Sequence, residues 1–519
     1  MLTRTCLSIA LLGCLGAPAI GQEYYSVDRT ASNNNFTNVN FTRAQDDGSG
    51  NAEAETIALL KEQLKRMELR LEELENDVEK KVAATSSSSK HSEKASKDVD
   101  QRLKDLEKGF EKQGKSINKF DDSIPGLVHS GHKNPKMTLF GRIHLDYWAF
   151  PNADDGIETF EGGDPEDRVA FRRMRLGVAG DLNDNMFYKY EGEFAGGVAS
   201  SYRDAFIGFK SLPLFNTVIM GNHKRPYGLD HLNSSRYNVF IERPFIVEAL
   251  NQDARRLGIS SNGLSDDQAW NWRYGLYHQN LTQTTSGWTG DHYQSEFAAR
   301  IANTAWYDES SGGRGYFHWA VSGSYGQVDG GSPENAARYR TRPEARSDAR
   351  WLDTGRIAGA EETFLFGLET VFNVGAFQLT AEYMQNNVER DPGVGNDVGI
   401  GGGYVQVAYF LTGEHTPWVR KTGTLGRVKP FENFFSVRNC DGDRAFGLGA
   451  WQVAARYSYA DLQDQDIIGG KGESLTLGLN WWWNPNARMQ LNYLVGEIER
   501  EPIASGDYEI VGLRWMVDF

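Results

Sequence analysis

The sequence predicts an all-β transmembrane β-barrel of about 16 antiparallel strands, with an N-terminal α-helical coiled-coil extension. Two patterns lead to this fold class: apolar and polar residues alternate through residues 137–519, and apolar residues recur in a seven-residue repeat within residues 53–124. The sequence also lacks, after its N-terminus, any run of roughly 18 apolar residues that could form a membrane helix. Composition agrees, because 56 glycines and 12% aromatic residues suit strands punctuated by turns, and a net charge of -15 argues against binding nucleic acid.

Residues 1–21 are typical of a secretory signal peptide. Arg4 is followed by a short apolar run, residues 7–15, and then by small residues at the cleavage-type segment. An alternative is a lipoprotein box, LLGC, that would lipidate Cys14, but the bulky Leu12 fits that motif poorly. Cleavage would leave Cys440 as the one cysteine of the exported chain, so no internal disulfide is expected.

The next segments predict a tether. Residues 22–52 form a polar leader, and residues 53–124 form a coiled-coil segment interrupted by a Ser-rich linker. A narrow apolar seam has no core of its own to cover it, so the heptads predict association with partner chains in either two or three strands. The seam consists of Ile57, Leu60, Leu64, Met67, Leu71, Leu74 and Val78.

Alternation begins in MTLFGRIHLDYW and continues in TLGLNWWWNPNARMQLNYLVGE, where Asn484-Pro485-Asn486 makes a tight turn between two strands. A soluble β-sandwich would alternate as well. Aromatic residues distinguish the two folds, since a membrane barrel places them where its outer face meets the headgroups. Trp451, Trp483, Tyr493 and Trp515 lie on the apolar face near expected strand ends, which favours the barrel.

Sixteen strands are expected between residues 137 and 519, and a barrel of that size leaves an aqueous lumen. The final stretch, YEIVGLRWMVDF, alternates up to Phe519, which predicts that the last strand closes the barrel on the first. The expected strands begin near Met137, Val169, Met186, Arg203, Asn216, Ala254, Gln268, Gln294, Gly315, Glu361, Ala376, Gly401, Ala445, Lys471, Ala487 and Asp507.

If the apolar faces meet lipid, the other faces line the lumen, and these lean basic. Rings of Arg or Lys select anions in pores, although the same cations could simply pair with acids across the wall. The expected lumen cations are Arg142, Arg173, Arg175, Lys189, Arg273, Arg300, Arg456, Arg488 and Arg514, opposite Asp146, Glu191, Glu193, Glu296, Glu382 and Asp518.

Residues 221–259 interrupt the alternation with a long segment, and such a loop is more often functional than idle. It is expected either to fold inward and narrow the lumen or to cap the barrel from outside. Its cations are Lys224, Arg225, Arg236, Arg243, Arg255 and Arg256. A second Arg-rich loop, residues 334–356, is expected to attract anions at the mouth.

Four segments resemble the phosphate-selective porin O and P family: NHKRPYGLDHLNSSRYNVFIERPF, LTGEH, GAWQVAARYSYADL and LGLNWWWNPNARMQLNY. The resemblance covers residues 137–519. It implies a trimeric outer-membrane porin, a passive diffusion channel for small anions such as phosphate, with the coiled coil in the periplasm. Phosphate-selective members use an arginine ladder and a lysine-rich outer vestibule, whereas the expected outer loops here include acidic stretches such as DQDIIGG.

Two other functions remain open from sequence. The chain could be a general or cation-tolerant porin, or a structural tether that joins the outer membrane to the cell wall through its coiled coil. An outer-membrane hydrolase is a weaker option, because no Ser, His and Asp spacing indicates a nucleophile. We therefore expect no enzyme activity, no catalytic residues, no metal and no cofactor, and as partners the lipid bilayer, small anions and a homotrimer.

Overall fold

The computed structural model describes residues 136–519, except 196–199, 252–254, 283–292 and 439–443. The predictions for the signal peptide, the polar leader and the coiled coil, together with Cys440, lie outside the described residues. Within the described ranges, no helix is long and apolar enough to cross a membrane.

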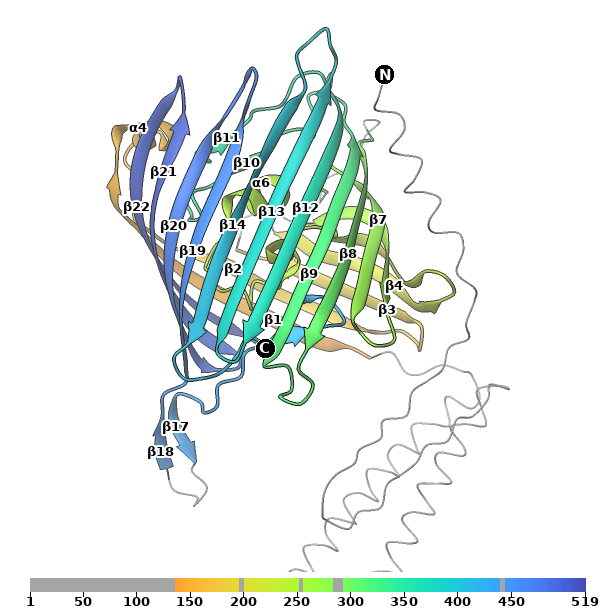
Figure 1. Ribbon diagram of the computed structural model, residues 1–519, viewed down its shortest axis with the longest axis vertical. Coiled ribbons are helices and arrows are strands. Elements are labelled where there is room, and N and C mark those ends of the chain that lie inside the picture. Colours follow the sequence, from red (N-terminus) through yellow and green to blue (C-terminus); the bar gives the residue numbers. More distant parts are fainter. Residues whose placement is uncertain (1–135, 196–199, 252–254, 283–292, 439–443) are drawn as a thin grey trace, which may run out of the picture. The chain divides into compact units, whose positions relative to one another are not determined.

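Sixteen antiparallel strands form a closed barrel in which each strand pairs with its neighbours in chain order (Figure 1). The predicted barrel is thus confirmed, and most strands begin within a few residues of the expected positions. The barrel strands are β1 (Thr138–Ala153), β2 (Arg168–Asp181), β3 (Met186–Glu193), β4 (Ser201–Leu212), β5 (Asn216–Lys224), β6 (Arg255–Leu264), β7 (Trp270–His278), β8 (Ser295–Tyr307), β9 (Gly315–Gln327), β12 (Ala360–Val374), β13 (Phe377–Arg390), β14 (Val398–Phe410), β19 (Ala450–Asp464), β20 (Ile467–Asn484), β21 (Ala487–Arg500) and β22 (Ala504–Asp518).

The last strand closes the barrel on the first, as the alternation in the final twelve residues predicts. β22 pairs with β1 in a register that joins Arg142 to Asp518 and Tyr147 to Leu513. Phe519 continues the ladder with two backbone hydrogen bonds to Gly141, of 3.0 and 3.2 Å. A side chain at position 141 would collide with the Phe519 ring, so glycine is required where the chain end lies against the first strand.

The outward and inward faces differ sharply in chemistry. On β20, Leu475 and Leu477 are 43% and 49% exposed, whereas Thr476 between them is fully buried in the interior. The outward positions are apolar from Leu475 to Trp483 and are preceded by Glu473. This band of about nine residues matches the 9–11 residues with which a tilted strand crosses a bilayer.

The connections at the two ends of the barrel differ in length. We call the end at which β1 begins and β22 ends the terminal end, and the opposite end the far end. Most turns at the terminal end are short, as the Asn484 to Asn486 turn predicts. The exception is the 411–449 connection between β14 and β19, which carries β15 (Trp418–Val419), β16 (Thr424–Leu425), β17 (Phe435–Arg438) and β18 (Arg444–Gly447).

Two sequence-based boundaries are wrong. The expected strand start at Ala445 belongs to the small β17–β18 hairpin, and the barrel strand β19 begins at Ala450, after Gly449 turns the chain with a φ of +67°. The long loop spans residues 225–254 and not 221–259, because its flanks pair as strands: Lys224 on β5 lies opposite Arg255 on β6.

Two connections from the far end enter the barrel. Residues 225–254 carry α5 (Leu229–Leu232) and α6 (Phe245–Asn251), and residues 328–359 carry β10 (Arg340–Thr341) and β11 (Leu352–Asp353). Phe245 and Trp351, one from each of these two connections, belong to the same buried apolar cluster. Between β1 and β2, α4 (Asp155–Glu161) packs against β22 at the far end.

Leu513 lies near the middle of the outward band on β22, so Leu513→Arg should destabilise the folded barrel by about 2–4 kcal/mol. Glu509→Arg, at the edge of the same band, should cost roughly 0–1 kcal/mol because the charge reaches the interface. Urea titration of both variants in lipid vesicles, followed by tryptophan fluorescence, measures the difference. Equal stability of the two variants would show that this face does not meet lipid.

Candidate functional site: a cationic cavity inside the barrel

Residues 225–251, the described part of the 225–254 segment, lie inside the barrel. Of the two expectations for this loop, the inward course is therefore correct. Lumen-facing side chains of β19 to β22 donate hydrogen bonds to its backbone carbonyl oxygens. Arg514 Nη1 reaches the carbonyl oxygen of Ile241 at 2.6 Å, and Arg488 Nη2 reaches that of Asn238 at 2.6 Å. Asn480 and Gln490 both donate to the carbonyl oxygen of Val239, and Arg456 Nη1 donates to that of Glu242.

A carboxylate holds the other end of the segment. Glu382 on β13 accepts the backbone N–H groups of Leu229 and Asp230 at 2.6 and 2.7 Å, which are the first residues of α5. On the opposite side, Lys224 Nζ donates to three carbonyl oxygens at the end of α5, those of His231, Leu232 and Asn233. The segment is therefore held from both sides of the lumen by groups that satisfy its backbone.

Several predicted lumen cations serve in this buried scaffold. Arg514 also forms a bidentate pair with Asp146 at 2.7 and 2.6 Å, and Arg456 pairs with Glu344 from the 328–359 connection at 2.5 Å. Arg300 pairs with Glu369 and donates to the carbonyl oxygen of Gly423. These guanidinium groups lie in the lumen, as the alternation predicts, but their donors are directed at protein acceptors.

A cavity of about 270 Å³ remains between the 225–254 segment and the wall formed by β1 to β7. Eight of the fifteen cations predicted for the lumen wall and the long loop line it, and the acids among its described lining residues are Glu191 and Asp204. The eight are Arg142, Arg173, Arg175, Lys189, Lys224, Arg243, Arg255 and Arg273. The lining is strongly cationic although the whole chain is acidic.

The acids of this wall hold the guanidinium groups in place. Glu191, fully buried, accepts from Arg142 and Arg175 at 2.9 Å each, and Glu193 accepts from Arg175 Nε at 2.6 Å. Asp204 accepts from Lys189 and Arg255. A guanidinium has five donors, so one carboxylate fixes its orientation and leaves further donors for a solute.

Arg173 differs from these neighbours. Its Nη1 lies 3.5 Å from His144 Nδ1, its Nε has no hydrogen-bond partner, and it is 4% exposed. No described residue forms an ion pair with Arg173. A buried charge without a paired carboxylate is costly, so this group has the strongest need for an anion in the cavity.

A second, smaller void of about 50 Å³ adjoins the first and shares Arg173, Arg175, Arg243 and Arg255 with it. It adds Arg172 and Arg203, which the sequence-based prediction did not include as site residues. Arg172 forms a bidentate pair with Glu242 of the inward segment, at 2.6 and 3.0 Å.

A β-bulge explains why Arg172 was missed. His144 lies opposite Arg173 and Leu145 lies opposite Phe171, so Arg172 is the extra residue of β2. Strict alternation places Arg172 on the opposite face from Arg173, together with the outward Met174, and so does not assign it to the lumen. The spacing of the outward residues Phe171 and Met174, 50% and 37% exposed, is three and not two, and this spacing is the signal that could have revealed it.

A second register shift lies where Glu191 meets β4, because Tyr190 pairs with Ala205 and Gly192 pairs with Tyr202. Arg203 and Asp204 therefore oppose one residue, Glu191. Both shifts concentrate charged side chains on the inner face of the short strands β2 to β4, and bulges commonly redirect side chains at functional sites in this way.

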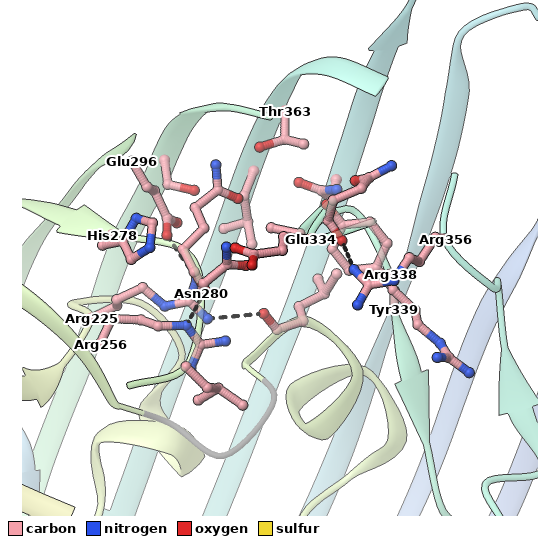
Figure 2. Close-up of a pocket in the computed structure, with 18 of the residues that line it drawn as sticks. Arg225, Arg256, His278, Asn280, Glu296, Glu334, Arg338, Tyr339, Arg356 and Thr363 are labelled. Atoms are coloured by element: carbon pink, nitrogen blue, oxygen red, sulfur yellow. Dashed lines mark hydrogen bonds and ion pairs between the residues drawn. The ribbon is translucent and has the colours of Figure 1, made fainter. Parts of the chain in front are cut away.

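Arg225 and Arg256 line a different cavity, of about 400 Å³, between the inward segment and the 328–359 connection. Figure 2 shows Arg225, Arg256 and His278 on one side of it and Arg338 and Arg356 on the other. Two of its cations have carboxylate partners: Arg225 pairs with Glu296 at 2.7 Å, and Arg338 pairs with Asp353 at 2.6 Å.

The remaining cations lie at the two ends of the lumen. Arg236 pairs with Asp518 at 3.3 Å near the terminal end, where Arg427 of the 411–449 connection also pairs with Asp518. Arg273 donates to the carbonyl oxygen of Thr422 at 2.7 Å, so this connection enters the lumen from the terminal end, which the sequence did not predict.

In the 328–359 connection, the charge of Arg172 and burial lower the pKa of Arg346 to about 10, so Arg346 remains cationic at neutral pH.

Comparison with known proteins identifies the family to which this chain belongs. The sequence profile described as phosphate-selective porin O and P matches residues 138–519, the entire barrel. The chain belongs to this family. An uncharacterised protein of Caulobacter vibrioides is 28% identical over 396 residues, which are 73% of this chain and 73% of the relative. Porin O of Pseudomonas aeruginosa is 22% identical over 413 residues, covering 73% of this chain and 87% of the relative.

Among solved structures, the outer membrane channel DcaP of Acinetobacter baumannii matches 74% of this chain and 98% of its own, with 13% identity and a TM-score of 0.43. Membership in the porin O and P family makes this chain an outer-membrane channel protein. Among the described residues, no group of three or more His, Cys, Asp or Glu side chains is arranged to hold a metal ion.

The docking of the inward segment on Arg514 can be tested with the double variant Arg514→Met/Asp146→Asn, which removes a buried pair. Glu242, which Arg514 also contacts at 2.9 Å, keeps its bidentate pair with Arg172, so no lone charge is left. We expect the barrel to fold, the 225–254 segment to become accessible to protease, and single-channel conductance to rise because the segment no longer restricts the lumen.

Arg390→Met/Asp466→Asn is the matched control, because it removes a bidentate pair, of 2.5 and 3.1 Å, that does not contact the segment. Unchanged conductance and protease resistance in the Arg514 double variant would show that the remaining carbonyl contacts suffice.

Proposed function

We propose that this porin is a passive diffusion channel for small anions, phosphate among them. The proposal rests on the cavity of about 270 Å³. Its described lining contains eight cations and two acids. Both acids already bind cations of the wall, so the net charge left for a solute is positive. Guanidinium groups offer planar pairs of donors that match the oxygens of phosphate.

The order of the cations along the lumen supports transfer of an anion from site to site. β2 runs from the far end toward the terminal end, so Arg172 and Arg173 precede Arg175, and Arg142 on β1 follows beside Glu191. Arg346, whose pKa Arg172 lowers to about 10, extends the series toward the far end. Conduction requires that an anion binds favourably at several neighbouring sites and tightly at none of them. A series of cations that are partly neutralised by carboxylates provides such sites.

The proposal also covers the orientation of the barrel in the membrane, its assembly into a homotrimer and the location of the N-terminal segment. Outer-membrane barrels have short periplasmic turns and longer extracellular loops, so the terminal end, with its mostly short turns, faces the periplasm. Residues 53–124 would then extend into the periplasm as a coiled coil. A heptad seam there fits a homotrimer of barrels and a contact with the cell wall.

The test is the reversal potential of the purified protein in a planar bilayer under a KCl gradient, followed by titration with phosphate. We expect an anion-selective potential and block of chloride current by phosphate. Arg173→Gln should weaken phosphate block by roughly 10- to 100-fold, since a hydrogen bond to a charged group contributes about 1.5–3 kcal/mol. Folding should be retained, because no described residue forms an ion pair with Arg173.

Arg314→Gln is the control for net charge. Arg314 lies in the turn between β8 and β9, where it donates to the carbonyl oxygen of Gly413, and it lines neither cation-rich void. It should leave phosphate block unchanged. Cation selectivity of the wild type would support a general porin, absence of conductance would support the tether, and equal effects of both variants would show that the block does not arise at Arg173.

A further inference from the structure

The β17–β18 hairpin is an unexpected feature at the terminal end. It lies within the 411–449 connection and projects beyond the end of the barrel wall (Figure 1). Phe435 on β17 is 64% exposed and Phe446 on β18 is 63% exposed. Phe431 and Leu448, which flank the hairpin, are also exposed. Apolar side chains this exposed outside the lumen need a partner of matching chemistry.

Aromatic rings join the hairpin to the outer wall without interruption. On the wall, Trp451 stacks on Trp481 at 4.7 Å between ring centroids, and Trp481 meets Trp483 edge-on at 5.7 Å. Phe434 then packs edge-on against Trp481 at 4.6 Å and lies 5.6 Å from Phe446. The rings of Phe435 and Phe446 complete the series at 6.2 Å.

Hydrogen bonds fix the base of the hairpin to this wall. The indole N–H groups of Trp451 and Trp481 both donate to the carbonyl oxygen of Leu448, at 3.1 and 2.9 Å. The backbone N–H of Phe434 donates to the carbonyl oxygen of Trp483 at 2.7 Å. Because the indole N–H groups of Trp451 and Trp481 are satisfied by protein, the faces of these two rings can enter an apolar environment without an unpaired donor.

The attachment point lies at the edge of the outward apolar band. That band ends on β20 at Trp481 and Trp483, and the strand itself ends at the next residue, Asn484. Tryptophan is enriched where the hydrocarbon core of a membrane meets the headgroups. The aromatic series therefore begins at the membrane surface and continues without interruption onto the base of the hairpin, which extends beyond the wall.

We propose that the β17–β18 hairpin is an interfacial membrane anchor that places Phe435 and Phe446 at the headgroup boundary of the leaflet nearest the terminal end. Lipid is the occupant that the structure favours, because the exposed rings continue the wall's lipid-facing surface. The anchor holds the 411–449 connection, whose other half enters the lumen, against the membrane. It does not depend on the ion selectivity of the channel.

Depth-dependent quenching tests this anchor in the full-length protein reconstituted in phosphatidylcholine vesicles. Ser436, opposite Phe446 in the hairpin register, is changed to Cys and labelled with a bimane fluorophore in a background in which Cys6, Cys14 and Cys440 are Ser. Ser310→Cys, in the exposed turn between β8 and β9 at the same end, is the matched position. We expect brominated lipid to quench the label at position 436 but not at 310, and aqueous iodide to do the reverse.

The double variant Phe435→Ser/Phe446→Ser should lose the lipid quenching at position 436 while its heat-modifiable migration is retained. Leu214→Ser is the control, since Leu214 is an exposed apolar residue of another turn at the terminal end, and it should preserve the quenching. Iodide access at position 436 equal to that at 310 would overturn the proposal. Protection of position 436 from both quenchers would also overturn it, in favour of contact with protein, such as a second copy of the chain.

Discussion

Complete pairing of the barrel wall is the constraint on which the rest of this structure depends. Lipid offers no partner for backbone N–H and C=O groups, so every strand needs two neighbours and the last must meet the first. The pairing of β22 with β1, extended by the hydrogen bonds between Phe519 and Gly141, meets this requirement. Sixteen strands then enclose a lumen wider than side chains alone can fill, and the interior has to be shaped by chain segments that enter it.

Those segments make the lumen asymmetric, and the asymmetry gives the arginine residues different roles. On the side of β19 to β22, Arg456, Arg488 and Arg514 satisfy carbonyl oxygens of the 225–254 segment. On the side of β1 to β6, Arg142 and Arg175 are oriented by carboxylates and border open volume. The same residue type thus builds the constriction on one side and leaves charge available to a solute on the other.

The local charge of the cavity is opposite to that of the whole chain, which carries a net charge of -15. This contrast is physically reasonable because charges separated by more than the Debye length, about 8 Å at physiological salt, are largely screened when they face water. The acids of the exposed surface therefore contribute little to the potential beside Arg173, whereas Glu191 and Asp204 within the wall contribute directly. Overall charge is a poor guide to the selectivity of a lumen.

The sequence by itself determined the wall: the number of strands, their approximate starts, the faces of Arg173 and Arg175, and the closing role of the last strand. These features follow from local alternation, because each strand of a membrane barrel must present apolar side chains outward at every second residue. The sequence predicted an inward course only for the long loop after the fifth strand, and only as one of two alternatives. The entry of the 411–449 connection and the contacts of all the inward segments were not predicted.

Tertiary structure alone decided which cations share a cavity. Arg225 and Arg256 fall on the other side of the inward segment from Arg142, and Arg514 is engaged by Asp146 and Ile241, although alternation treats all of them alike. Arg172 joins the site through a bulge, which adds a residue without changing the pattern on either side of it. Alternation specifies on which face a side chain lies, but not what lies opposite it across the lumen, since that depends on chain segments distant in sequence.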